Sequence, residues 1–411
     1  MEFPIQAETS SFNTYFCLLL ANNILQAKGV ENGSNTVISP FLFHLLLSLI
    51  AVGSKGRTLE QLFHCLGSKS LEDINSLASQ MVDLASPFNK SNGVSIGEPD
   101  LSFVNAAWVA QSLKLKPSFQ EIVEGVYHAI AKEADFANKA EQVVAEVNAW
   151  AETATRGLIR NLLTAEALKV INELTALILA NALYFKGTWA QLFDTSKSKQ
   201  RVFHLLNGEK VHVPFMTSNR FERYLYRSFN GYKILKLPYK TSQPTRKFAM
   251  HFFLPDAKDG LKNLLQMFKS NPEYFNKRFD LVNEKISDFW VPRFKFEFEF
   301  EASEAMIKMG LDLPFNRSKA EITEMVDSVT EPLFVRKMFH KCLIEVNEEG
   351  TEAAASTAVI IEQQQQSVYP NPSFVADHPF MFMIKEETSG VVFFVGAVLN
   401  PSLTPNIKQM G

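Results

Sequence analysis

The sequence predicts an α+β fold in which helices dominate the first 170 residues and strands the remainder. Apolar residues recur at helical spacing along much of the segment 16–155, whereas apolar runs of strand length begin at Leu177. The segment 294–301, FKFEFEFE, alternates phenylalanine with charged residues, as a strand does when it buries one face and exposes the other. An order in which helices come first along the chain and strands later favours an α+β fold over a doubly wound parallel sheet.

The expected elements follow from the period of the apolar residues. We expect helices over 16–27, with Gly29 as a left-handed cap, over 41–52, apolar nearly all round and ended by Gly53, and over 58–66, 70–84, 117–131 and 142–155. We expect strands over 101–110, 177–185, 232–237, 248–254, 294–301, 341–346, 380–384 and 391–398.

Composition describes an ordinary globular chain. Its 411 residues are 46% hydrophobic and 21% charged, and no linker divides them, so we expect one domain over residues 1–411. The formal net charge of -3 gives no general attraction to nucleic acid or to an acidic membrane.

The location is expected to be intracellular. Three cysteines without a CxxC pair make a disulfide framework improbable and favour a reducing compartment, the cytosol or the nucleus. The N-terminus lacks the basic region of a signal peptide, and the apolar run 41–52 is shorter than the roughly 20 residues that span a bilayer. Unconventional export stays open.

A long connection between the last strands is the candidate functional segment. It runs from about Glu348 to Ser373, far beyond the roughly 4 to 6 residues of a typical connection. Its alanines would form a helix on propensity alone. Small side chains are equally what a strand needs if it must slide between two packed strands. Read as a strand, one face of the segment carries Thr351, Ala353, Ala355, Thr357, Val359 and Ile361.

Several motifs resemble one family. The run NEEGTEAAAS over 347–356 resembles the hinge of inhibitory serpins, NTVISP over 35–40 their shutter, and NALYFKGTW over 181–189 their breach strand. His340-Lys341 and the segment 377–380, DHPF, fit the C-terminal core of that family. The segments FVADHPF over 374–380, WAE over 150–152 and FHLL over 203–206 are most similar to the plant branch. Leu42 departs from the pattern, because many serpins carry a small hydroxylated residue there, so the shutter is expected to pack differently.

The resemblance implies a fold, a mechanism and a set of site residues. It implies the serpin fold, with mixed, mostly antiparallel sheets and an exposed reactive-centre loop. It implies a protease inhibitor that acts as a suicide substrate: a serine or cysteine protease attacks the loop, is held as an acyl-enzyme, and is carried away when the loop inserts into the central sheet. The implied hinge is Glu349, Gly350, Thr351, Glu352, Ala353, Ala354, Ala355, Ser356 and Thr357, and the structural residues of shutter and breach are Ser39, Asn181, Trp189 and His340.

By family spacing the cut bond is Gln364-Gln365, and cleavage could slip by one bond within the glutamine run 363–366. The resemblance implies a monomer that forms a covalent complex with its protease and has no metal, cofactor or catalytic group of its own. A merely solvated polar tract would account for the glutamines equally well in a protein that is not an inhibitor.

The serious rival is a non-inhibitory serpin that acts as a storage or binding protein. His340 and Cys342 lie two apart on an expected strand and could face one way, like a nucleophile and its base, but their neighbours are core-like and no third orienting group is evident. The cysteines and histidines show no zinc-ligand spacing.

Overall fold

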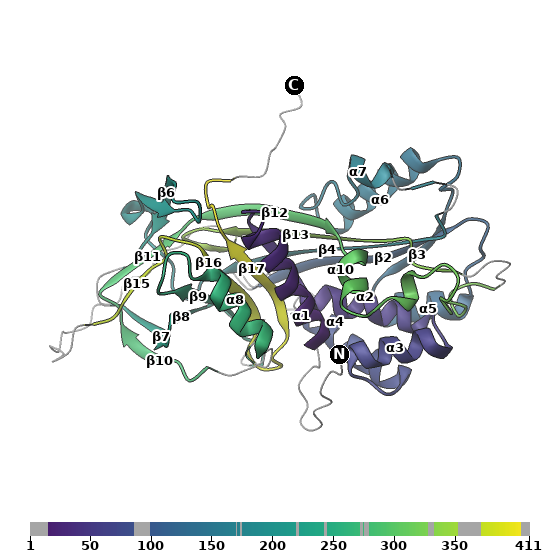
Figure 1. Cartoon of the computed structure of the whole chain (residues 1–411), viewed down its shortest axis with the longest axis horizontal. Helices are drawn as coiled ribbons and strands as arrows, with labels where there is room; N and C mark the ends of the chain where they lie inside the picture. Colours follow the sequence, from purple (N-terminus) through teal and green to yellow (C-terminus); the bar gives the residue numbers. More distant parts are fainter. Residues whose placement is uncertain are drawn as a thin grey trace.

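The computed structural model describes residues 15–85, 99–169, 171–172, 175–218, 222–241, 245–271, 274, 279–327, 333–351 and 371–403, drawn in Figure 1. Within these residues the strands form a seven-stranded sheet of order β1-β17-β16-β9-β8-β7-β10 and a four-stranded sheet of order β15-β11-β6-β5. A third sheet, here called the central sheet, has the order β12-β13-β4-β2-β3, and the short strand β14 pairs with β4.

The strands of the described residues have the following bounds: β1 Thr36–Ile38, β2 Asp100–Ala110, β3 Ile130–Ala134, β4 Leu177–Thr188, β5 Lys199–His204, β6 Lys210–Met216, β7 Arg223–Phe229, β8 Tyr232–Pro238, β9 Phe248–Pro255, β10 Val282–Lys285, β11 Asp288–Pro292, β12 Phe294–Glu301, β13 Lys337–Val346, β14 Gly350–Thr351, β15 Ser373–Val375, β16 Phe380–Glu386 and β17 Val392–Val398.

The helices are α1 Tyr15–Ile24, α2 Pro40–Val52, α3 Gly56–Leu66, α4 Leu71–Ala85, α5 Pro117–Gly125, α6 Ala140–Ala154, α7 Ala165–Leu168, α8 Leu261–Ser270 and α10 Ser303–Lys308. A π-helical segment η1, Leu25–Val30, follows α1, and the short turns η3, Thr195–Lys197, and η4, Leu313–Phe315, are 3-10 helices.

The central sheet separates two hydrophobic clusters. Along β4, Leu179, Leu183 and Phe185 point into the main core, and the alternate residues Ala180 and Tyr184 point into a smaller cluster that includes buried residues of α6. Figure 1 shows α6 and α7 on one side of these strands and α2 and α4 on the other. Both faces are therefore covered, and any strand added beside β4 must fit between two packed layers.

Most expected elements are confirmed. The helix over 41–52 is α2, whose residues are all buried and whose C-terminal neighbour is Gly53, and the expected strands appear as β2, β4, β8, β9, β12, β13, β16 and β17. The segment FKFEFEFE is β12, paired antiparallel with β13. No helix among the described residues is long and apolar enough to cross a membrane.

Two expectations were wrong. The helix expected over 117–131 ends at Gly125, and residues 130–134 form β3, which pairs parallel with β2. The sequence IAKEA has helical propensity, but pairing with the edge of a sheet overrides it. Gly29 is not a left-handed cap, because the chain continues as η1 and the positive backbone angle occurs at Gly33, with φ of 68°.

Candidate functional site

The long loop leaves the central sheet at a place where two strands part. β13 and β4 pair in parallel from Lys337 opposite Ile178 to Leu343 opposite Tyr184. Beyond that point β14 lies beside β4 instead, in antiparallel pairing, with Gly350 opposite Thr188 and Thr351 opposite Gly187. A single bridge between Asn347 and Gly350 ties β14 to the end of β13.

Gly350 is required by its backbone and its surroundings. Its φ is 148°, a conformation that side chains rarely adopt. A Cβ atom there would lie 2.0 Å from the carbonyl oxygen of Gly187. The next residue, Thr351, is fully buried, and its hydroxyl lies 2.9 Å from the hydroxyl of Tyr239. The first turn into the sheet is therefore already closely packed.

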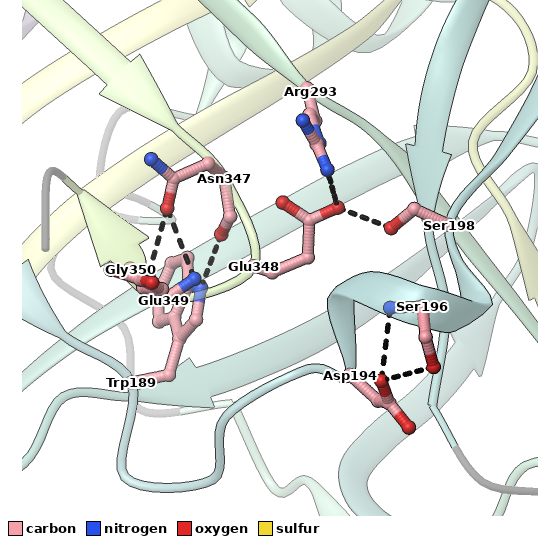
Figure 2. Close-up of polar contacts among 9 residues, drawn as sticks. All are labelled: Trp189, Asp194, Ser196, Ser198, Arg293, Asn347, Glu348, Glu349 and Gly350. Atoms are coloured by element: carbon pink, nitrogen blue, oxygen red, sulfur yellow. Dashed lines mark hydrogen bonds and ion pairs between the residues drawn. The ribbon is translucent and has the colours of Figure 1, made fainter. Parts of the chain in front are cut away.

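Trp189 holds the turn between β13 and β14, as Figure 2 shows. Its indole Nε1 donates to the carbonyl oxygen of Asn347 at 2.9 Å, and its backbone N donates to the carbonyl oxygen of Glu349 at 2.9 Å. The side-chain Oδ1 of Asn347 accepts hydrogen bonds from the backbone N of Glu349 at 3.0 Å and of Gly350 at 3.3 Å. Trp189 also stacks on Tyr239, with ring centroids 4.6 Å apart.

A buried carboxylate fixes the chain just before β14. Glu348 is only 2% exposed, and its Oε1 accepts a hydrogen bond from Arg293 Nε at 2.6 Å. Arg293 Nη2 forms an ion pair with the same oxygen, and the hydroxyl of Ser198 donates to it as well (Figure 2). These three residues, here called the Glu348 clasp, join the loop to the start of β5 and to the segment that precedes β12.

A second polar cluster lies beneath the middle of the central sheet. The backbone N of Ser39 donates to His340 Nε2 at 3.2 Å, and His340 Nδ1 lies 2.7 Å from Asn181 Oδ1. Asn181 Nδ2 donates to the carbonyl oxygen of Leu42 at 3.3 Å. A single tautomer of neutral His340 is compatible with all three contacts: its Nε2 accepts a hydrogen bond and its Nδ1 donates one. The backbone of Leu42 therefore supplies an acceptor at the position where a hydroxylated residue was expected.

His340 and Cys342 are close, as their spacing suggested, with 3.2 Å between Nε2 and Sγ. Both side chains are fully buried. Burial lowers the pKa of His340 to about 3 and raises the pKa of Cys342 well above its ordinary value. A thiolate nucleophile needs the opposite shift for the cysteine. The pair is therefore a neutral part of the core, and nothing favours its acting as a nucleophile.

The site residues predicted from the sequence form two groups in the structure. Ser39, Asn181 and His340 meet in the cluster beneath the sheet, whereas Trp189, Glu349, Gly350 and Thr351 lie at the root of the loop. The remaining hinge residues 352–357 and the expected cut bond Gln364-Gln365 lie outside the described residues.

The far end of the loop returns on a different sheet. Ser287 holds it, because its backbone N donates to the carbonyl oxygen of Pro372 at 2.8 Å and its hydroxyl to that of Asn371 at 3.1 Å. The strand β15 then pairs parallel with β11 in the four-stranded sheet.

Sequence reasoning missed four members of the site. Glu348 was placed in the loop but given no role, and Arg293, Ser198 and Tyr239 were not singled out. Arg293 offers the one visible signal, a charged residue between Pro292 and the alternating segment 294–301. Its partner lies 55 positions away along the chain.

Comparison with known proteins gives consistent matches over nearly the whole chain. A family model described as serpin (serine protease inhibitor) matches residues 11–401. The chain is 41% identical over 397 residues to Serpin-ZX of Arabidopsis thaliana, covering 96% of this chain and 98% of that protein. It is also 41% identical over 399 residues to Serpin-ZXA of Oryza sativa subsp. japonica, covering 97% of each. The structure of Arabidopsis AtSerpin1 in its native stressed conformation matches with a TM-score of 0.83 at 39% identity, covering 96% of this chain and all of that one.

The His340 cluster predicts a specific dependence of stability on pH. The folded pKa of His340, about 3, lies below the value near 6.5 of an unfolded histidine. As pH falls below about 6.5 the unfolded chain takes up the proton first, so stability is lost toward pH 3. Substitution of His340 by Gln should remove about 1 kcal/mol of the loss between pH 6.5 and 5.5. Thermal unfolding at several pH values measures this.

The comparison must be between wild type and His340→Gln, because His44 also has a depressed pKa, of about 4, and contributes to the same acid loss. A His44→Gln variant serves as the second reference, since it should change the pH dependence without touching the contacts to Ser39 and Asn181. Identical pH profiles for wild type and His340→Gln would contradict the neutral role of His340.

The Glu348 clasp predicts coupling between two distant residues. Glu348→Gln should destabilise the protein by roughly 2 to 3 kcal/mol, because it leaves Arg293 without its carboxylate in a partly buried site. The double variant with Arg293→Gln should cost less than the sum of the two single changes. Thermal unfolding of the four proteins gives the coupling energy.

The neighbouring Glu349→Gln is the matched control, since only its backbone takes part in the contacts described above. It should leave the unfolding midpoint nearly unchanged. Additive effects in the double variant, or equal effects of the changes at 348 and 349, would show that the clasp does not hold the loop.

Proposed function

Because this chain belongs to the serpin family and has the serpin fold, we propose that it is a protease inhibitor of the suicide-substrate type. A serine or cysteine protease would attack the loop and form an acyl-enzyme through its own nucleophile. The severed loop would then insert beside β4 as a new strand of the central sheet. In this scheme the chain supplies no catalytic group and acts as a monomer.

The observation that carries the proposal is the register of β14. Gly350 and Thr351 already pair antiparallel with Thr188 and Gly187 of β4. Continued in the same register, Ala353 would come opposite Phe185 and Ala355 opposite Leu183. Residues directly opposite each other in a sheet point to the same face. The small side chains would therefore point into the main core, where Phe185 and Leu183 already lie.

The same register gives Thr357 a defined place. It would lie opposite Asn181 on β4 and, because the Asn347-Gly350 bridge sets the pairing with β13, opposite His340 as well. Those two side chains now contact each other at 2.7 Å. Insertion must part them, and a threonine hydroxyl can both donate and accept a hydrogen bond. The Thr357 hydroxyl is thus suited to form hydrogen bonds with Asn181 and His340 after insertion has separated them.

The other face of the inserted strand would point toward α6. Ala354, Ser356 and Ala358 would lie opposite Tyr184, Ala182 and Ala180, which belong to the smaller cluster under that helix. Small residues are needed here because the layer is already packed. Glu352 would come opposite Lys186, which is exposed, and this pair of opposite charges favours the same register.

Insertion accounts for inhibition in physical terms. The segment from Gly350 to Gln364 is about 15 residues long, and at about 3.3 Å per residue it would move the attached protease by roughly 50 Å. Distortion of the protease's oxyanion hole would slow deacylation by orders of magnitude. The intact protein must then be held in its fold by a kinetic barrier, and insertion releases the stored free energy.

Cleavage is proposed at Gln364-Gln365, with one-bond slippage within the glutamine run. A neutral amide lacks the charge that an Arg- or Lys-specific pocket requires, so proteases of that kind are poor candidates. The cytosol or nucleus is the proposed location, since the buried free thiols of Cys17, Cys65 and Cys342 suit a reducing compartment.

The rival function is that of a non-inhibitory serpin that stores or binds another molecule. Such a protein could be cut as a substrate without trapping its protease. Large, charged or proline residues on the inserting face would favour the rival, because they oppose insertion of a strand. That face carries Thr351, Ala353, Ala355 and Thr357 instead, which favours the inhibitor.

The test is a panel of serine and cysteine proteases, each incubated with the full chain and examined on denaturing gels. We expect a covalent complex with at least one protease and, by mass spectrometry, a cut within residues 363–366. Thr351→Arg and Ala353→Pro should each convert the inhibitor into a substrate that is cut without a complex, since arginine cannot be buried unpaired and proline cannot donate in the ladder.

Ser367→Arg is the control, because it lies beyond the expected cut and outside the inserting segment. It should retain complex formation with the same protease. If both hinge variants formed as much complex as wild type, insertion would not be the mechanism. Cleavage without a complex in every wild-type reaction would favour the storage or binding role.

A further inference from the structure

A cleft of about 490 Å³ lies between the start of β5 and the start of β11. Ser196, Lys197 and Lys199 line one side, and Ser287 and Trp290 line the other. Thr217 and Ser218 also line it. The lining thus combines two lysines with several hydroxyl-bearing residues and two aromatic residues, Phe289 and Trp290, in a volume that suits a small molecule.

The charges at this cleft favour an anion. Arg201 adds a third cation, since its guanidinium lies over the ring of Trp290 at 4.2 Å. Two carboxylates partly offset these cations: Asp288, which lines the cleft and accepts a hydrogen bond from Trp290 Nε1 at 2.6 Å, and the nearby Asp194, which accepts from the backbone and side chain of Ser196. Asp194 also faces Lys197, with 3.6 Å between Nζ and Oδ2.

The cleft touches both ends of the long loop. Ser198, which lies between Lys197 and Lys199 in the chain, donates its hydroxyl to Glu348 at the root of the loop (Figure 2). Ser287, on the opposite wall, holds the carbonyl oxygens of Asn371 and Pro372 at the far end. Each wall of the cleft therefore contacts one end of the loop.

We propose that this cleft binds a small, multiply charged anion bearing phosphate or carboxylate groups, and that binding favours the intact loop over the inserted one. The lysines and hydroxyls would hold the anion, and Trp290 would pack against it. Cleavage removes the covalent link between the two ends of the loop that contact these walls, so the cut protein should bind the anion more weakly. By thermodynamic linkage the anion then opposes insertion. The second part rests on the proposed inhibitor function, whereas the binding site does not.

Binding is tested on the full chain without any protease. Inorganic pyrophosphate and citrate are titrated separately at constant ionic strength, with tryptophan fluorescence as the signal and calorimetry as a second measurement. We expect saturable binding of one or both, and the comparison shows whether phosphate or carboxylate is preferred. Trp290→Phe should abolish most of the fluorescence change.

The variant Lys197→Gln/Lys199→Gln should bind about tenfold more weakly, since it removes two charge-assisted contacts. The control is Lys132→Gln/Lys139→Gln, which removes the same charge from exposed positions on β3 and just before α6. Equal affinities of the two double variants, or a signal that never saturates, would overturn the site.

The coupling is tested by comparing intact protein with protein cut in the loop. We expect at least a fivefold weaker affinity after cleavage, and a slower rise of heat-resistant material when the intact protein is warmed with the anion. Equal affinity for both forms would refute the coupling. If the protein bound the anion but formed no complex with any protease, the anion site would stand and the proposed inhibitor function would be refuted.

Discussion

Insertion of the loop depends on the pairing of Gly350 and Thr351 with Thr188 and Gly187, at the end of β4 where β13 has turned away. This short ladder sets the register for everything that follows along the loop. It requires a glycine at 350, because a Cβ atom would collide with the carbonyl of Gly187. It also buries Thr351 against Tyr239. The intact chain thus already presents the start of a strand at the end of β4, next to the residues of β4 that pair with β13.

Two polar arrangements hold this region, one before β14 and one farther along the central sheet. The Glu348 clasp holds the chain before β14 through Arg293 and Ser198. The contact of Asn181 with His340 closes the sheet farther along, beneath its middle. Asn181 and His340 are fully buried, so separating them costs more than breaking an exposed contact would. In the proposed mechanism this contact forms part of the barrier that keeps the intact loop outside the sheet, whereas the clasp anchors the chain from which the new strand starts.

Sequence reasoning predicted the strongly patterned elements and failed where tertiary contacts decide. The alternation of residues 294–301 predicts β12 and the nearly all-apolar run 41–52 predicts α2, because burial of one face or of the whole element leaves these patterns in the sequence. Residues 130–134 look helical locally, and only pairing with β2 makes them a strand. Motifs identified Ser39, Asn181 and His340. The pairing of Glu348 with Arg293 could not be predicted from the sequence, because a single charged residue does not identify a partner that is distant in the chain.

The most direct test of the central claim compares the thermal unfolding of intact protein with that of protein cut once within residues 363–366 and kept as a two-chain species. A midpoint well above that of the intact form, by tens of degrees, is expected, because the inserted strand separates β4 from β13 and pairs with both, so that two ladders of hydrogen bonds replace one. An unchanged or lower midpoint after cleavage would contradict it, and the serpin fold of this chain would then have to serve another purpose.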